Sequence, residues 1–65
     1  MDFNNLVNMA NDAVRNNKIR EAIKFLEDAF KINPNSHDVC VKLGILTQQL
    51  GDIELSIEYF KKSIM

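Results

Sequence analysis

The sequence is short of several residue types, and each shortage excludes a class of protein. Its single cysteine cannot form an internal disulfide bond, which rules out a secreted, disulfide-linked scaffold. One proline and two glycines exclude collagen-like and low-complexity chains. At 65 residues the chain is long enough for one small domain but not for two independent cores, and most enzymes are longer.

The charge balance and the lack of a long apolar run narrow the classes further. Eight basic residues against nine acidic ones give a formal net charge of -1, whereas nucleic-acid binding needs clustered positive charge. The longest clearly apolar run, residues 43–46, contains a glycine and is far shorter than the roughly twenty apolar residues of a membrane span. The first five residues lack the basic start and apolar core of a signal peptide. We therefore expect a cytoplasmic protein with no nucleic-acid partner and no membrane insertion.

The residues that are present have the composition of a folded, soluble chain, and their spacing is helical. Hydrophobic residues make up 46% of the sequence and charged residues 26%, which argues against intrinsic disorder. Apolar residues recur at intervals of three and four, as in an amphipathic helix, and no segment alternates as a strand would. The sequence therefore predicts an all-α fold. The amphipathic stripes are Phe3, Leu6, Val7, Ala10, Ala13 and Val14; Ile19, Ala22, Ile23, Leu26, Ala29 and Phe30; and Ile53, Ser56, Ile57, Phe60, Ser63 and Ile64.

Three short segments separate the predicted helices. Residues 16–17 are asparagines, which tolerate the left-handed conformation that ends a helix. Residues 33–36 contain Pro34, which cannot continue a helix, followed by residues that can cap the next one. Residues 51–52 are glycine and aspartate. We predict helices over residues 3–16, 18–32, 37–50 and 52–65, and turns this short arrange them as antiparallel hairpins.

The two halves of the chain align at an offset of 34 residues. The aligned pairs include Val7–Val41, Ile19–Ile53, Ile23–Ile57, Ala10–Gly44, Ala22–Ser56, Leu26–Phe60 and Asn17–Gly51. In two of these aligned pairs, Ala10–Gly44 and Ala22–Ser56, both residues are small, and these are positions where two helices would have to approach closely. Gly44 falls in mid-helix, where glycine costs about 1 kcal/mol relative to alanine, and close helix packing is the usual reason for it.

In this register the chain resembles a known family, the tetratricopeptide repeat, whose unit is a helix-turn-helix. The second half carries Cys40-x2-Leu43-Gly44-x2-Thr47, then Gly51-Asp52, then Ser56-x3-Phe60, and the first half carries Leu6-x2-Met9-Ala10-x2-Ala13, then Ala22-x3-Leu26, Ala29 and Pro34. The family's tryptophan and tyrosine positions hold smaller residues here. The resemblance implies an all-α fold of tandem antiparallel helix-turn-helix repeats, four helices in a right-handed superhelical stack. It implies one domain over residues 1–65, with repeat one at about 3–36 and an incomplete repeat two at about 37–65.

The resemblance also implies a function. In this family the first helix of each repeat lines a concave groove that holds an extended peptide or a partner helix. Carried over by register, the groove residues are Asn4, Val7, Asn11, Arg15, Asp38, Val41, Lys42, Ile45, Gln48 and Gln49. They combine apolar patches with amides that can pair with a peptide backbone. We therefore expect a non-catalytic interaction module whose partner is another protein or a peptide.

Some members of the family bind acidic chaperone tails through lysine, asparagine and arginine on these helices. Val7 stands where the first such lysine is expected, Asn11 matches, and Lys42 replaces the second asparagine. We therefore expect no chaperone-tail carboxylate clamp.

Nucleic-acid binding is a rival interpretation. Residues 46–54 resemble the turn of a DNA-binding helix-turn-helix, but the following helix begins with Asp52, Glu54 and Glu58, which phosphates repel. A relative of the helical-repeat RNA readers would need a basic groove, and Asp38 together with the net charge speaks against one.

Enzymatic chemistry has one candidate. Cys40 and His37 lie one helical turn apart, as a nucleophile pair or half a metal site would. Cys40 falls at an inward-packing position, where a free cysteine acts as a small hydrophobe, and His37 falls at an exposed helix start. A zinc site usually takes four ligands, and the sequence has no second histidine or cysteine. We expect no catalytic site, no metal and no cofactor.

The last predicted helix suggests a second surface. Repeat units bury their faces against neighbours, so this helix would leave Ile57, Phe60 and Ile64 partly uncovered. Exposed apolar patches mark interaction sites. We expect either a two-fold homodimer centred on these residues, which makes the chain a self-assembling scaffold, or a chain that is the start of a longer repeat array.

Overall fold

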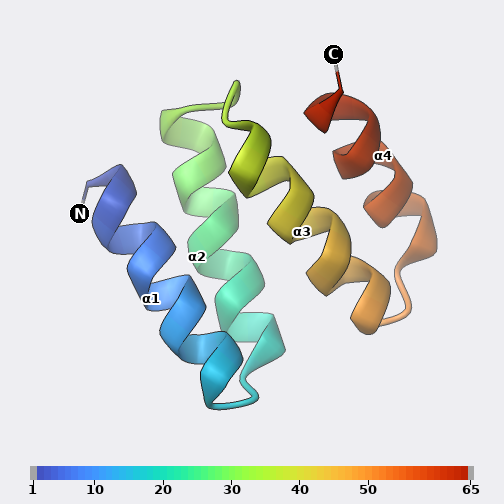
Figure 1. Ribbon diagram of the computed structural model, residues 1–65. Coiled ribbons are helices and arrows are strands. Elements are labelled where there is room, and N and C mark those ends of the chain that lie inside the picture. The colour runs from blue at the N-terminus through green and yellow to red at the C-terminus, as the bar shows by residue number, and fades with distance from the viewer. Residues whose placement is uncertain (1, 65) are drawn as a thin grey trace.

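The computed structural model describes residues 2–64 and contains four helices (Figure 1). They are α1 (Phe3–Arg15), α2 (Ile19–Ile32), α3 (His37–Gln49) and α4 (Ile53–Ser63), and no strand occurs within the described range. The predicted all-α fold of antiparallel hairpins is confirmed. The predicted helix ends agree to within two residues, except that the end expected at residue 65 lies outside the described residues.

Side-chain caps and left-handed residues set the helix boundaries. Asp2 accepts a hydrogen bond from the Asn5 amide at 2.8 Å, and Ser36 and Asp52 cap α3 and α4 in the same way. Asn17 has φ 64° and Gly51 has φ 89°, as the aligned turns predict. Each turn closes with the same pair of backbone bonds, so α1–α2 and α3–α4 are copies of one hairpin. Those bonds are Lys18 N to Ala13 O at 2.8 Å and Asn17 N to Val14 O at 3.0 Å, repeated as Asp52 N to Thr47 O at 2.9 Å and Gly51 N to Gln48 O at 3.0 Å.

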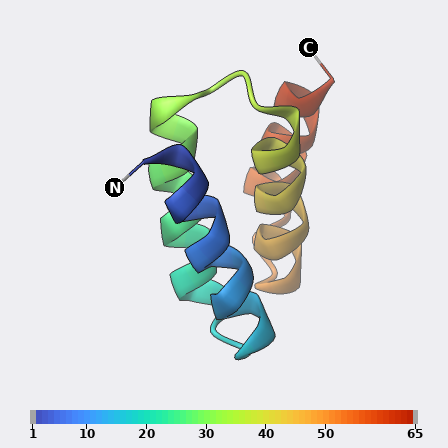
Figure 2. The same cartoon turned by 60° about the vertical axis from the view of Figure 1, so that its left-hand side comes forward.

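The hairpins stack side by side. Helix α3 packs against both α2 and α4, whereas α1 packs mainly against α2. Figures 1 and 2 together place α1 and α3 on one side of the molecule and α2 and α4 on the other. The first helices of the two hairpins therefore share one face, as the repeat register requires.

The core runs through the centre of this stack. Its buried hydrophobic residues are Leu6, Ala10, Ala13, Ala22, Leu26, Ala29, Val39, Cys40, Leu43, Leu46 and Tyr59. Two positions of these stripes are exposed against expectation, Val14 and Ile53, whereas Ile57 and Ile64 are exposed as the sequence predicts for the last helix. A stripe is buried only where a second helix covers it, and among the helices of residues 2–64 none packs on the outer sides of α1 and α4. Gly44 allows the expected close approach, because a Cβ there would lie 2.5 Å from Cε1 of Phe60.

Candidate peptide-binding groove

An open pocket of about 390 Å³ lies between α1 and α3. Its floor is apolar and comes from three helices: Ala10 of α1, Leu26 of α2 and Leu46 of α3. Val14 and Ile45 form the walls, and both side chains remain partly in contact with solvent, at 41% and 45% exposure. The pocket can therefore bury an apolar side chain of a partner without rearranging the core.

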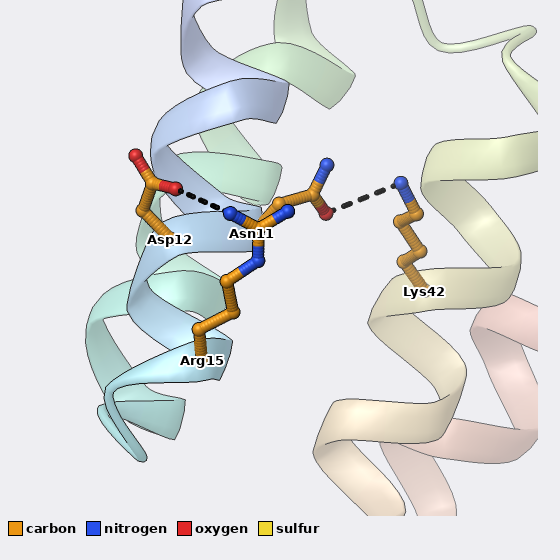
Figure 3. Close-up of polar contacts among 4 residues, drawn as sticks. All are labelled: Asn11, Asp12, Arg15 and Lys42. Atoms are coloured by element: carbon orange, nitrogen blue, oxygen red, sulfur yellow. Dashed lines mark hydrogen bonds and ion pairs between the residues drawn. The ribbon is translucent and has the colours of Figure 1, made fainter.

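Polar side chains stand at the rim of this pocket (Figure 3). The Lys42 ammonium of α3 donates a hydrogen bond to Oδ1 of Asn11 on α1 at 3.3 Å, so the two walls are joined by a side-chain bridge. The same ammonium lies 3.2 Å from Oδ2 of Asp38. This bond and this ion pair hold the positive charge of Lys42 at a defined place on the rim.

Arg15 supplies the second cation at the rim. Its Nη1 donates to Oδ1 of Asp12 at 3.5 Å, and these side chains are 80% and 69% exposed. An exposed pair of this kind contributes little to stability, so Arg15 can exchange Asp12 for an acidic group of a ligand at small cost. Within residues 2–64, the charged side chains that line the pocket are Arg15 and Lys42, both of them cations.

The structure brings together part of the predicted groove. Asn11, Arg15, Lys42, Ile45 and Gln49 line the pocket. The remaining predicted positions flank it or lie away from it: Asn4 and Gln48 are exposed, Val7 and Val41 are half-buried, and Asp38 reaches the pocket only through its pair with Lys42.

Of the pocket's apolar lining, sequence reasoning found only Ile45. Helical spacing puts Val14 in the buried stripe of the first helix, yet it forms a pocket wall. The repeat register contains a signal for this, because Val14 aligns with the polar Gln48, a position that faces solvent. Ala10, Leu26 and Leu46 are core residues whose surfaces reach the pocket floor, and helical periodicity cannot separate that role from ordinary burial.

Outside the groove, the reactive side chains that the sequence singles out are buried in the core or lie against a neighbouring residue. Cys40 is buried as expected, and Nδ1 of the exposed His37 lies within hydrogen-bonding distance of the Ser63 carbonyl oxygen. Burial raises the pKa of the Tyr59 phenol, with smaller contributions from Glu27, Cys40 and Glu58. In the part of the chain that the structure describes, histidine, cysteine and carboxylate side chains form no cluster of three or more that could hold a metal ion. None of the four helices is long and apolar enough to cross a membrane.

Two copies of one hairpin, stacked with their first helices on a shared face, define a helical-repeat protein. The family model for the tetratricopeptide repeat matches residues 5–36 and again residues 37–65, so the chain belongs to this family and carries two tandem repeats. Repeats of this family are generally non-catalytic protein–protein interaction modules. No curated protein sequence matches the chain.

Proposed function

We propose that the groove between α1 and α3 binds an extended peptide or a partner helix of another protein, with no catalytic step. The observation that carries the proposal is the open pocket with an apolar floor, bounded by one helix of each repeat. A leucine-sized or phenylalanine-sized side chain of the partner would lie over Leu26 and Leu46, between Val14 and Ile45. Amides of Asn11 and Gln49 would pair with the partner's backbone.

The charges at the rim indicate the chemistry of the partner. Arg15 and Lys42 favour acidic residues next to the apolar anchor, and they disfavour basic ones. This arrangement is not the chaperone-tail clamp. Val7 packs against the core where that clamp has a lysine, and Lys42 stands where the clamp has its second asparagine.

Peptide titration followed by amide NMR shifts tests the proposal. A short peptide with one leucine flanked by glutamates should shift the amides of α1 and α3 around Val14 and Ile45. The same peptide with lysines, or with serine in place of leucine, should bind at least about tenfold more weakly. Ile45→Ser should abolish the shifts, whereas Ile32→Ser, at another exposed isoleucine on α2, should leave them intact. Shifts that persist in Ile45→Ser, or that map to α4, would show that this groove is not the site.

We propose self-association through α4 as a second function. Its support is the exposure of Ile57 and Ile64, at 48% and 82%, on a helix with a free side. Phe60 is half-buried because its ring covers Gly44, so its outer edge alone is available to a partner.

A further inference from the structure

The two second helices of the hairpins differ in what covers one stripe of residues. On α2 the stripe is Ile19, Ile23, Leu26 and Phe30, and on α4 the aligned stripe is Ile53, Ile57, Phe60 and Ile64. Every member of the α2 stripe is at least half-buried, and Leu26 is 1% exposed. Ile53, Ile57 and Ile64 are exposed. Helix α2 has α3 as an additional neighbour, and its Phe30 also meets Tyr59 of α4, whereas within residues 2–64 no further helix packs on α4. We take this stripe as the face that receives the next hairpin.

The first helices differ in the complementary way. Val39, Leu43 and Leu46 of α3 are buried, whereas the aligned residues of α1 are Asn5, Met9 and Asp12, of which Met9 is half-buried and the other two are exposed. The positions that face the hairpin partner are buried in both helices: Leu6 and Cys40, Ala10 and Gly44, Ala13 and Thr47. The additional stripe of α3 is therefore its contact with α2.

Because of this difference, the outer face of α1 is poorly suited to packing against another helix. If a second copy laid its α1 on the free face of α4, as α3 lies on α2, Asn5 and Asp12 would be buried against isoleucines without hydrogen-bond partners. Head-to-tail stacking is therefore disfavoured. The α4 face itself is free of this cost, because the exposed members of its stripe are isoleucines and the half-buried member is Phe60.

We propose that the occupant of this face is the α4 helix of a second copy, antiparallel to the first about a two-fold axis. Reversing the direction places Ile53 opposite the second copy's Ile64 and Ile57 opposite its Phe60, so that the four apolar residues form continuous layers. A closed pair results rather than a growing array.

Charge complementarity selects the antiparallel direction. Glu54 and Lys61 are exposed and lie two helical turns apart, along the solvent side of the apolar stripe. In the antiparallel pair the Glu54 of each copy lies near the Lys61 of the other, which gives two ion pairs. A parallel pair would place Glu54 near Glu54 and Lys61 near Lys61 instead.

This arrangement rests on the self-association proposed above, and sedimentation equilibrium of the whole chain tests the two in turn. The wild type should pass from monomer to dimer, and no further, as concentration rises. Ile57→Glu enters the interface twice and should raise the dimer Kd by about 100-fold or more. Ile32→Glu, at an exposed isoleucine of α2 outside the stripe, should leave the Kd unchanged. Circular dichroism of both variants shows whether the fold is kept.

Charge reversal tests whether the two α4 helices are antiparallel. Glu54 and Lys61 are exposed, so reversing their charges should not disturb the fold of the monomer. Glu54→Lys and Lys61→Glu should each raise the Kd by about tenfold, and the double variant should restore it. A dimer that responds to Ile57→Glu but not to the charge reversals would overturn the antiparallel register and leave self-association standing. A wild type that stays monomeric would overturn both, and a ladder of larger species would overturn the closed α1 end.

Discussion

The two hairpins bury the same positions with different side chains. In the first hairpin the close contacts are made by alanines: Ala10, Ala13, Ala22 and Ala29. The second has Gly44, Thr47, Ser56 and Ser63 at the aligned positions. Its hydroxyls bond across and along the hairpin, with Ser56 Oγ donating to the Gly44 carbonyl at 2.8 Å and Thr47 Oγ1 to the Leu43 carbonyl at 2.7 Å. One backbone shape therefore accommodates a purely apolar contact and a hydrogen-bonded one.

A second difference is an exchange of volume. In the second hairpin the Phe60 ring occupies the space of the Cβ that Gly44 lacks. The aligned positions of the first hairpin are Ala10 and Leu26. A smaller residue on one helix thus accompanies a larger one on the other, and packing is kept. The comparison shows which features of the repeat are fixed, namely the register and the turn, and which are exchangeable.

The largest expected effect is a loss of stability that is greater for a substitution in the central helix α3 than for the aligned substitution in the outer helix α1. Leu43→Ala should lower the free energy of unfolding by about 3 kcal/mol, since Leu43 is fully buried, and that loss is enough to unfold most of a domain this small. Met9→Ala, at the aligned and half-buried position of α1, should cost about 1 kcal/mol. Urea unfolding followed by circular dichroism, at fixed protein concentration, measures both. Equal losses would mean that α1 and α3 are equally buried in solution.

The Gly44–Phe60 exchange gives the next largest effect. Gly44→Ala should destabilise by about 1 to 2 kcal/mol, because the new methyl group displaces the Phe60 ring and this outweighs the better helix propensity of alanine. Phe60→Leu should cost about 1 kcal/mol through lost burial. The double variant copies the Ala10–Leu26 pair of the first hairpin. It should be more stable than the sum of the single changes by about 1 kcal/mol.

Strict additivity in that cycle would contradict the exchange of volume. The matched control is Ala10→Gly in the first hairpin, where the residue aligned with Phe60 is Leu26 and no aromatic ring can fill the space. Ala10→Gly should lower the free energy of unfolding by roughly 1 kcal/mol, because glycine has the lower helix propensity. The loss should be independent of Phe60→Leu.

The hydroxyl of Ser56 has a smaller effect. Ser56→Ala copies Ala22 of the first hairpin and removes the bond to the Gly44 carbonyl. That oxygen keeps a second hydroxyl donor, Thr47 Oγ1 at 3.2 Å, so the loss should be about 1 kcal/mol or less. Thermal unfolding of the variant beside the wild type checks this. A loss above about 2 kcal/mol would mean that the bond, rather than the close approach, holds the second hairpin together.

Much of this fold is readable in the sequence, because helical period and turn chemistry are local properties. The left-handed residues Asn17 and Gly51 align through the 34-residue repeat alone, and a glycine in mid-helix indicates a close approach at Gly44. Its partner, Phe60, could not be named as the ring that fills the gap. Which side chain meets a given glycine depends on how two helices are rotated about their axes, and periodicity leaves that rotation open.

The groove is less predictable than the fold. Its polar rim follows from the repeat register, which places Asn11, Arg15 and Lys42 on the face where the pocket lies. The wall at Val14 does not follow, because an apolar stripe predicts burial only where a neighbouring helix covers it. The same reasoning explains the exposed Ile53 on α4. Whether an amphipathic face is core or binding surface is decided by the count of neighbours, which is a property of the stack.

The smallest expected effect is a pH dependence of stability that comes from Tyr59. The aligned residue of the first hairpin, Phe25, has no group that ionises. Burial first, and then the neighbouring Glu27, Cys40 and Glu58, raise the pKa of Tyr59 above its ordinary value of 10.0. The folded chain therefore holds the phenol proton at a pH where the unfolded chain has released it. The stability contributed by this proton is complete below about pH 10 and is lost as pH rises through the folded pKa.

Tyr59→Phe copies Phe25 of the first hairpin and should remove that part of the alkaline loss of stability. The ring contact with Phe30, at 6.0 Å between centroids, remains possible for phenylalanine. The measurement is urea unfolding of both proteins at a series of pH values from neutral to strongly alkaline. The other groups that ionise at high pH are present in both proteins, so the difference between the two curves reports the phenol together with its coupling to Cys40. The wild type should lose stability more steeply above about pH 10, and parallel curves would show that the phenol ionises with equal ease in the folded and unfolded chain.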